Sequence, residues 1–455
     1  MVNSKDSWLA VALTLVMVVL PFAAPALAQT SNMKLAIEWQ HYLPGVSGTS
    51  VIQTSDGGFL ALGLDASSQT VVVKTDSSGN VLWSKTYSLG NFSDTELGLA
   101  VQTSDGYILA GTALVKIDQL GNIVWERDYE TLTSNISWVV AAGPPTAIDA
   151  VTQTSDGGFA LIATANTEYS YGIPGFWVMK VDSTGNLLWI KGVSATSPLF
   201  SGTIQPFFGI PCSIFQTADQ GFLIVSTEYA HAYESTPLQM FKLDSDGNVQ
   251  WNQTYDWHTG SPQSDIYAMY AKSSIPMTDG YLIAGEVEPI AYDESTETGL
   301  ILKTDLQGNL VWNKTCTYSG LPSNIDSVTK ANDSNLMFVG SATKETIPGE
   351  FDVNSRTYTW VVEVDSLGNV RAQFAIYMGH HQSNPASIIQ TNDGGHVFVG
   401  VWNDSSFWIV KVGGIQSTGV SNLSSFSLPL TVAGASVTVV VITVVIVWKR
   451  SKRPE

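Results

Sequence analysis

Histidines and acids that could bind a metal ion occur close together near the middle of the chain. His231 follows Glu228, and His258 follows Asp256. Imidazole and carboxylate groups are ligands that zinc and other transition metals accept. Neither pair has the spacing of a motif such as HExxH, so solvated loop residues are the competing interpretation. A shared ion requires the two histidine side chains to lie within about 10 Å of each other, because ligand distances are roughly 2 Å.

Other catalytic groups form no recognisable arrangement. The sequence contains no GxSxG motif, no phosphate-binding loop and no pairing of cysteine with histidine. Because the chain is rich in acids, a carboxylate pair for glycoside hydrolysis stays open, but no pair stands out. We therefore assign no catalytic, cofactor or metal residue, and favour a binding protein over an enzyme.

The elements that position these residues are repeated β-strands. The stretch from Val51 to Tyr87, VIQTSDGGFLALGLDASSQTVVVKTDSSGNVLWSKTY, has four short apolar runs and two glycine-bearing turns. It predicts four strands, because glycine supplies the positive φ that tight hairpins need. Versions recur to about Gly414, and repetition at this period is typical of a propeller or solenoid. The aspartate of the first turn marks seven copies: Asp56, Asp105, Asp156, Asp219, Asp279, Asp333 and Asp393.

The second turn carries Gly-Asn in six copies. Four residues after the glycine stands a tryptophan in the first five: Trp83, Trp125, Trp189, Trp251 and Trp312. The sixth copy has Arg371 there, and Glu363 where the first five have lysine. A tryptophan at the same position of most repeats predicts a large apolar side chain that packs as a wedge between neighbouring sheets. The alternative, a row of exposed rings that bind sugars, is less favoured. The aspartates predict turns, and the run from Asp244 lacks the later glycine and glutamate of a calcium loop.

The seventh copy ends after three strands, at FWIVKVGG. The missing strand is supplied by Leu35 to Tyr42, which carries Trp39 in the register of the repeat tryptophans. We therefore predict an all-β fold, a seven-bladed β-propeller over residues 33–414 that is closed by the N-terminal strand. Closure removes the open sheet edges that would otherwise template aggregation.

The two kinds of turn predict two different faces of this ring. The short repeated turns form a uniform face, and the long variable segments gather on the opposite face, named here the variable face. Function usually resides on variable loops held by a rigid scaffold. The candidate ligand residues on the variable face are Glu228, Tyr229, His231, Tyr233, Asp256, Trp257, His258, His380 and His381.

Apolar segments at both ends predict export and anchoring. Residues 1–28 have the charge, the apolar run and the Ala-Leu-Ala end of a signal peptide, with an uncleaved anchor as the alternative. Residues 426–448 carry no charge and are long enough for one transmembrane helix, with GPI processing as the alternative. The basic tail, residues 449–455, should remain cytoplasmic, which places the propeller outside the cell membrane. Residues 415–425 are a flexible tether.

Composition agrees with an exported ectodomain. The net charge is −19, and only 13% of residues are charged. An acidic chain without a basic patch disfavours nucleic acid as a partner. The two cysteines, Cys212 and Cys316, leave a disulfide open. Of the N-x-S/T sequons, the candidates for glycosylation are Asn91, Asn135 and Asn422.

The repeated pattern QTxDGG…KxDxxGNxxW resembles that of exported β-propeller repeat proteins of archaea and bacteria. The resemblance covers roughly residues 35 to 414 and implies a scaffold, not an activity. More distantly it is similar to the tryptophan-docking repeats of quinoprotein dehydrogenases. Those imply a quinone, calcium and usually a vicinal disulfide, but this chain has no adjacent cysteines.

Three hypotheses follow. The favoured one is a membrane-anchored propeller that binds a protein, glycan or envelope component at the cell surface through its variable face. The alternatives are an extracellular glycan-active enzyme that uses carboxylates of that face, and a structural envelope protein.

Overall fold

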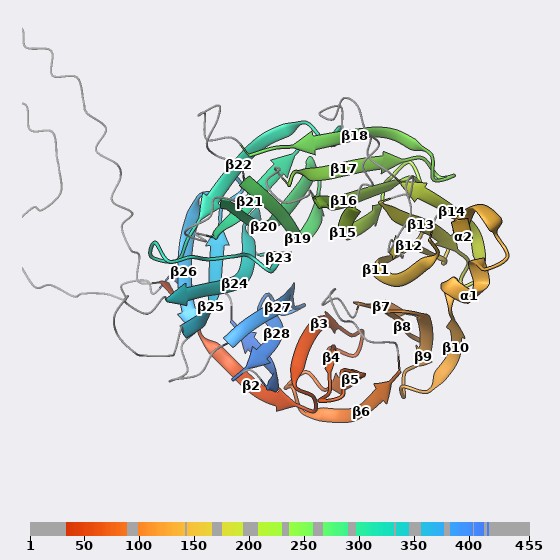
Figure 1. Cartoon of the computed structure of the whole chain (residues 1–455). Helices are drawn as coiled ribbons and strands as arrows, with labels where there is room; N and C mark the ends of the chain where they lie inside the picture. Colours follow the sequence, from red (N-terminus) through yellow and green to blue (C-terminus); the bar gives the residue numbers. More distant parts are fainter. Residues whose placement is uncertain are drawn as a thin grey trace, which may run out of the picture.

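The protein forms a ring of seven four-stranded antiparallel sheets around a central axis, as the sequence predicts (Figure 1). The computed structural model describes residues 33–88, 99–141, 143–165, 175–193, 208–229, 236–257, 267–289, 297–331, 334–344, 356–376, 383–403, 405–413 and 416–417. The predicted signal peptide and residues 418–455, which include the predicted transmembrane helix and basic tail, lie outside this part. Within the described residues, no helix has the length and apolarity needed to cross a bilayer.

Blades 1 to 6 follow the chain, with the first strand of each blade innermost (Figure 1). Blades 1 to 3 comprise β3 (Ser47–Gln53), β4 (Phe59–Leu64), β5 (Thr70–Thr75), β6 (Val81–Tyr87), β7 (Leu99–Thr103), β8 (Gly106–Ala110), β9 (Leu114–Asp118), β10 (Ile123–Arg127), β11 (Pro145–Gln153), β12 (Phe159–Ala165), β13 (Phe176–Val181) and β14 (Leu187–Val193). Blades 4 to 6 comprise β15 (Phe208–Gln216), β16 (Phe222–Tyr229), β17 (Leu238–Leu243), β18 (Val249–Tyr255), β19 (Tyr267–Met277), β20 (Gly280–Pro289), β21 (Thr298–Thr304), β22 (Leu310–Cys316), β23 (Ser327–Lys330), β24 (Leu336–Lys344), β25 (Arg356–Val364) and β26 (Val370–Ile376).

Blade 7 joins the two ends of the ring. It consists of β27 (Ser383–Gln390), β28 (His396–Trp402) and β29 (Ser406–Val412), and its outer strand is the N-terminal β2 (Ile37–Leu43). Trp39 pairs with Lys411 and Leu43 pairs with Phe407, so the predicted closure is confirmed. A further two-stranded ladder joins β1 (Met33–Lys34) to β30 (Gln416–Ser417). Both ends of the described chain therefore meet at one blade.

Burial explains the strand patterns. The third strands β5, β13 and β17 are buried at every residue, because neighbouring blades cover both of their faces. This is why they read as continuous apolar runs rather than as alternating ones. The outer strand β6 has two exposed residues at its start and then alternates, because only one of its faces is covered.

The repeat tryptophans lie against the second-turn glycine of the following blade. A Cβ on Gly121 would lie 3.0 Å from the Trp83 ring, and a Cβ on Gly185 would lie 2.8 Å from the Trp125 ring. The same relation joins Trp39 to Gly79 across the closure. These glycines also have φ near +80°, a conformation that favours glycine. Glycine is therefore required at this position both by the turn and by the close approach of the tryptophan ring. The prediction of an inter-sheet wedge is therefore confirmed.

A second set of contacts fastens the inner ring. Glutamines that precede the first turn contact the turn of the preceding blade: Gln102 accepts from the backbone N–H of Ser55 at 2.9 Å, and Gln216 accepts from that of Ser155 at 2.8 Å. Gln53 of blade 1 accepts from the N–H of Asn392 in blade 7 at 2.8 Å. The ring is thus closed by side chains as well as by β2.

Within a blade, the repeat lysine forms an ion pair with the first-turn aspartate. Lys180 lies 2.9 Å from Asp156, and its ammonium also donates to the carbonyl of Val181. The Thr154 hydroxyl and the Lys180 ammonium lower the pKa of Asp156 to about 2. Corresponding pairs are Lys74–Asp56, Lys116–Asp105, Lys242–Asp219, Lys303–Asp279 and Lys411–Asp393.

Blade 6 replaces this pair with a different arrangement. Glu363 occupies the lysine position, and it accepts from the Asn335 amide at 2.6 Å and lies 3.6 Å from Arg371. The two departures visible in the sequence, Glu363 and Arg371, are therefore partners. The blade that follows Arg371 is blade 7. Its third and fourth strands, β29 and β2, come from opposite ends of the chain and are not joined by a Gly-Asn turn. No glycine is therefore present to receive a tryptophan from blade 6, so arginine can occupy this position.

Candidate functional site

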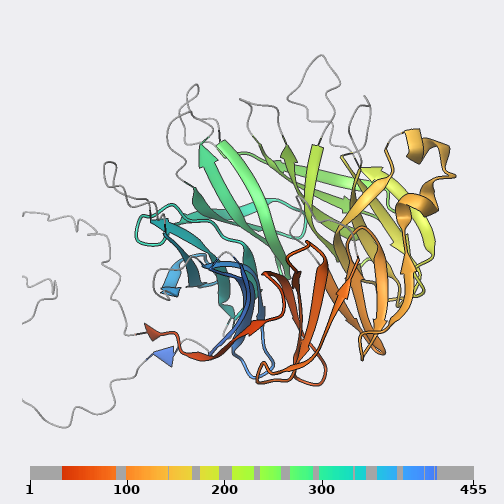
Figure 2. The same ribbon diagram turned by 60° about the horizontal axis from the view of Figure 1, so that its bottom comes forward.

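The variable face is defined by the strand order. In each blade the second hairpin and the crossover to the next blade lie at the end opposite to the first and third hairpins. Two short helices occupy the crossover from blade 2 to blade 3: α1 (Tyr129–Thr133) and α2 (Ser137–Ala141) (Figure 2). Neither helix is predicted from the repeat pattern. Asn135 lies between them and is exposed, so this sequon is accessible.

The described candidates of blade 4 lie at the predicted end of their strands. Glu228 and Tyr229 end β16, and Asp256 and Trp257 follow β18. Trp257 is half-buried and packs against the cluster between blades 4 and 5, so it also supports the rim of the blade. The other candidates lie outside the described residues: His231, Tyr233, His258, His380 and His381. The proposed histidine cluster therefore stays a prediction, as do sequons Asn91 and Asn422.

Metal binding has no support in the described part of the chain. No group of three or more His, Cys, Asp or Glu residues there could hold an ion. The turn aspartates are engaged by their own turns: Asp244 Oδ1 accepts from the N–H groups of Asp246 and Asn248, and Oδ2 accepts from the Asn248 amide at 3.0 Å. The interpretation of this run as a turn is confirmed.

The two cysteines are free thiols. Cys212 contacts the cluster between blades 4 and 5, whereas Cys316 contacts the cluster between blades 5 and 6. Burial raises the pKa of each thiol to about 12. Both therefore remain protonated at neutral pH and are poor nucleophiles.

Among the described residues, two sites carry carboxyl groups with raised pKa values. Burial raises the pKa of Asp149, in the innermost strand of blade 3, to about 7. In blade 5, burial and the neighbouring Glu286 and Glu288 raise the pKa of Glu297. Lys272 lies 3.5 Å from Glu286 and offsets part of this negative charge.

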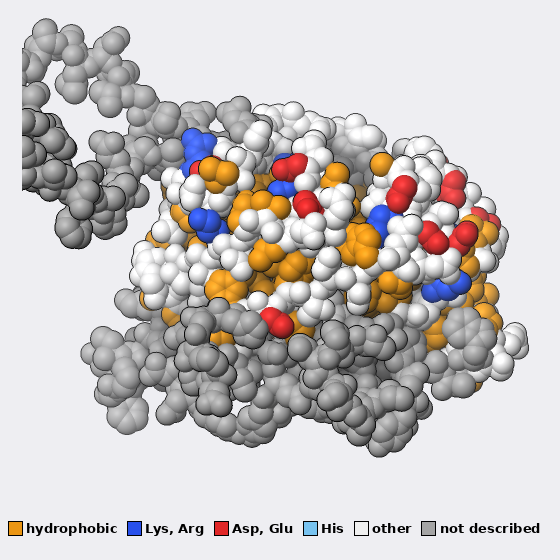
Figure 3. Space-filling view, turned by 90° about the horizontal axis from the view of Figure 1, so that it is seen from above, with side chains coloured by type: hydrophobic (Ala, Val, Ile, Leu, Met, Phe, Trp, Pro, Cys, Tyr) orange, Lys and Arg blue, Asp and Glu red, His pale blue; other side chains and the backbone are white. Residues whose placement is uncertain are grey.

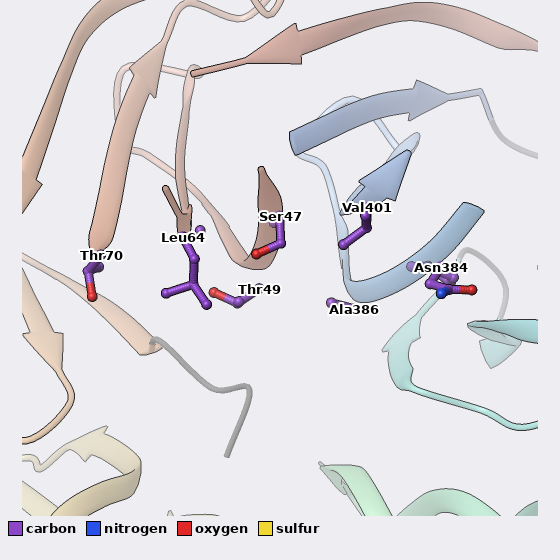
Figure 4. A pocket seen from close by; sticks show the side chains of 10 residues that line it. Ser47, Thr49, Leu64, Thr70, Asn384, Ala386 and Val401 are labelled. Carbon is purple, nitrogen blue, oxygen red and sulfur yellow. The ribbon is translucent and has the colours of Figure 1, made fainter. Parts of the chain in front are cut away.

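A concave pocket of about 170 Å³ lies where blades 7 and 1 meet (Figure 4). Blade 1 contributes the start of β3, the end of β4 and the start of β5, and blade 7 contributes the start of β27 and the end of β28. All of these are variable-face ends of their strands. Figure 4 shows the hydroxyl groups of Ser47 and Thr49 turned toward Leu64. The complete lining is Ser47, Gly48, Thr49, Gly63, Leu64, Thr70, Asn384, Pro385, Ala386 and Val401.

The outer wall offers a different kind of surface. Figure 3 shows apolar side chains there interspersed with charged ones. The exposed apolar residues stand at the starts of the outer strands, near the uniform face: Val81, Leu82, Ile123, Val124, Leu188, Val249, Leu310, Val311 and Val370. They recur around the ring instead of forming one patch.

Comparison with known proteins identifies no family for this chain. No protein-family model matches the chain, and no curated protein matches its sequence. Among solved structures, a protein of unknown function from Dyadobacter fermentans is 8% identical over 84% of this chain and 99% of that chain, with a TM-score of 0.44. The WD40 domain of SCAP from fission yeast is 8% identical over 85% of this chain and 99% of that chain, with a TM-score of 0.39. An α-L-arabinofuranosidase from Fusarium graminearum is 10% identical over 58% and 91%, with a TM-score of 0.37. Likenesses this weak carry no argument about this chain.

Proposed function

We propose that the protein is a membrane-anchored propeller of the cell surface that binds a protein, glycan or envelope component through its variable face. The propeller fold is compatible with binding, and the described residues supply a rigid ring whose variable face carries a pocket and the ends of many connecting segments.

The observation that carries this proposal is the place where the chain leaves the ring. β29 ends at the uniform face, where Gly413 donates to the carbonyl of Ala36 at 2.9 Å. The β1–β30 ladder follows directly and lies at the lower left in Figure 2. A tether that starts here and enters a membrane turns the uniform face toward the bilayer and the variable face away from it.

The length of the tether supports this orientation. Residues 418–425 separate β30 from the predicted membrane segment and can span at most roughly 28 Å when fully extended. The ring is thus held close to the membrane on its uniform side, and a ligand outside the cell meets the variable face first.

The test uses single cysteines at three places in the full-length protein. Ser67 lies in an exposed variable-face turn, Ser78 lies in an exposed uniform-face turn, and Ser451 lies in the basic tail. The native thiols give little background because their pKa values are raised to about 12. With a membrane-impermeant maleimide, we expect Ser67→Cys and Ser78→Cys to react in intact cells and Ser451→Cys to react only after lysis. Reaction of Ser451→Cys in intact cells would refute the topology.

The same variants test the binding face. The purified protein is screened against arrays of glycans and cell-surface proteins after a bulky polyethylene glycol maleimide has been attached. We expect modification at Ser67 to abolish binding, and modification at Ser78, the matched control, to leave it unchanged. The opposite result would place the binding site on the uniform face and contradict the proposal.

A further inference from the structure

We infer that Asn252 and Asn313, on the outer strands of blades 4 and 5, are sites of N-glycosylation. The inference rests on the proposed function in one respect, because it requires that the propeller is exported. It depends on the exposure of the two asparagines, on the hydroxyl groups that share their face of the strand, and on the composition of β18.

Both asparagines lie on the uncovered face of an outer strand. Figure 1 shows β18 and β22 at the outer edge of neighbouring blades. Trp251 of β18 is half-buried, whereas the next residue, Asn252, is exposed. Asn313 follows Trp312 in β22 and is likewise exposed. A glycan on either asparagine therefore extends into solvent and displaces no part of the described propeller.

The hydroxyl group that a sequon requires lies on the same face of each strand. An N-x-S/T sequon has Ser or Thr two residues after the asparagine. Alternate residues of a strand project to the same side, about 7 Å apart along its axis. Thr254 and Thr315 are accordingly exposed beside their asparagines. In β22 the middle residue, Lys314, reaches the next blade, where it donates to Asn369 Oδ1 at 3.5 Å. Both sequons thus present the amide and the hydroxyl together.

The two asparagines occupy one register of the repeat. Each directly follows the repeat tryptophan, which pairs with the repeat lysine of the third strand. In blade 1, Ser84 has the same place and is exposed as well. The residues after Ser84 are lysine and threonine, as they are after Asn313. Blade 1 therefore lacks only the asparagine, and it offers a matched position at which the site can be built.

The composition of β18 gives a physical reason for a glycan there. The outer edge of a blade carries unpaired backbone groups, and proteins keep such edges from pairing with other chains by charge, bulges or cover. β18 reads VQWNQTY and has no charged residue. A hydrated glycan on Asn252 covers the edge that has no charge of its own. The other six described outer strands each contain a charged residue, for example Glu38 in β2, Lys85 in β6, Arg127 in β10, Lys191 in β14, Lys314 in β22 and Arg371 in β26.

The modification is a substitution at a sugar carbon. The side-chain nitrogen of Asn252 forms a bond to C1 of an oligosaccharide carried on a lipid phosphate. The bond from C1 to the phosphate oxygen breaks, and the lipid phosphate leaves with the bonding electrons. The amide nitrogen gives up one proton to a base of the membrane-bound transferase, so no oxidant or reductant is needed. The donor is a membrane lipid, and the predicted anchor holds the propeller at a membrane.

The experiment uses the full-length protein, purified in detergent from the membranes of its native cells. Its peptides are sequenced by mass spectrometry with electron-transfer dissociation, which keeps a glycan on its residue. We expect the peptides of Asn252 and Asn313 to carry a glycan on the asparagine. Asn252→Gln and Asn313→Gln should each remove one glycan and leave the other in place. Recovery of both peptides only in the unmodified form would overturn the inference.

Further variants distinguish a sequon from mere exposure. Thr254→Ala should abolish the glycan on Asn252, whereas Thr254→Ser, which keeps the hydroxyl group, should retain it. Ser84→Asn completes the sequon of blade 1 and should gain a glycan, whereas Ser84→Gln, the matched control, should gain none. All these residues are exposed, so every variant should keep the circular dichroism and tryptophan fluorescence of the parent. A glycan that survives Thr254→Ala, or a folded Ser84→Asn variant that gains none, would contradict the argument from register.

The outcomes separate this inference from the proposed function. If Ser78→Cys reacts with the impermeant maleimide in intact cells and both asparagines are unmodified, export stands and the glycosylation sites are wrong. If neither Ser67→Cys nor Ser78→Cys reacts there and the asparagines are unmodified, both proposals fail. If the asparagines carry glycans but modification at Ser67 leaves array binding intact, the glycosylation sites stand and the variable-face proposal fails.

Discussion

Replacing Asp149 with asparagine should stabilise the protein, and more strongly as the pH rises. Asp149 is 1% exposed, and its Oδ2 accepts from the Thr164 hydroxyl at 2.6 Å. Its Oδ1 has no hydrogen-bond partner. Burial opposes the charged form of the carboxyl group and raises its pKa from 3.8 to about 7.

The sign and the size follow from linkage. A carboxyl group whose pKa is raised by folding favours the native state fully below pH 3.8, and this contribution is lost as the pH rises through about 7. A shift of about three pKa units corresponds to a penalty of about 4 kcal/mol at pH 8 and about 2 kcal/mol at pH 5. An asparagine does not titrate and can still accept the hydrogen bond from Thr164. The advantage of Asp149→Asn should therefore grow by about 2 kcal/mol between pH 5 and pH 8.

The assay is urea denaturation followed by tryptophan fluorescence at pH 5, 6.5 and 8. Asp246→Asn, in an exposed turn of blade 4, is the matched control and should give a constant difference from the parent. A free-energy difference for Asp149→Asn that does not change across this range would show that Asp149 is charged in the folded protein. The reasoning from burial would then be refuted.

Two further predictions concern the repeated contacts. Gly185→Ala should destabilise more than Gly57→Ala: both glycines have φ near +80°, but a Cβ on Gly185 would lie 2.8 Å from Trp125 whereas one on Gly57 meets nothing within 4 Å. We expect about 1 kcal/mol for Gly57→Ala and about 1–3 kcal/mol more for Gly185→Ala in denaturation experiments; equal losses would contradict the tryptophan contact. The protein should also lose stability as the pH falls from about 4 to about 2. Thr154 and Lys180 lower the pKa of Asp156 to about 2, and the stability that this carboxylate contributes is lost as it takes up its proton. Lys180→Met should make this loss shallower, and an unchanged acid transition in circular dichroism would show that the ion pair contributes nothing there.

Much of the fold was predictable because each blade repeats its turn chemistry. The strand count, the closure by the segment around Trp39 and the wedge role of the tryptophans all follow from residues at fixed spacing. The reason for Arg371 does not, because it depends on which blade receives each tryptophan, and that is a property of the closed ring. The helices α1 and α2 were also missed, since each has only five residues and no apolar periodicity to indicate it.

The pocket was harder to predict than the fold. Its lining comes from both ends of the sequence, because Ser47, Thr49 and Leu64 belong to blade 1 whereas Ala386 and Val401 belong to blade 7. The repeat pattern predicts that these two blades are neighbours, but not which of their residues leave a hollow between them.

The use of β2 as the outer strand of blade 7 sets the order in which the ring can be completed during synthesis. β2 leaves the ribosome before every strand of blades 1 to 6, and it has no partner until β29, made near the end of the chain, has emerged. Blades 1 to 6 can form one after another, because the strands of each are close together in sequence. Blade 7 forms only when β2 meets β29, and these two strands are separated by the sequence of all the other blades. Until then an edge of blade 7 is open to pairing with other chains, so the final step of folding is also the one most exposed to aggregation.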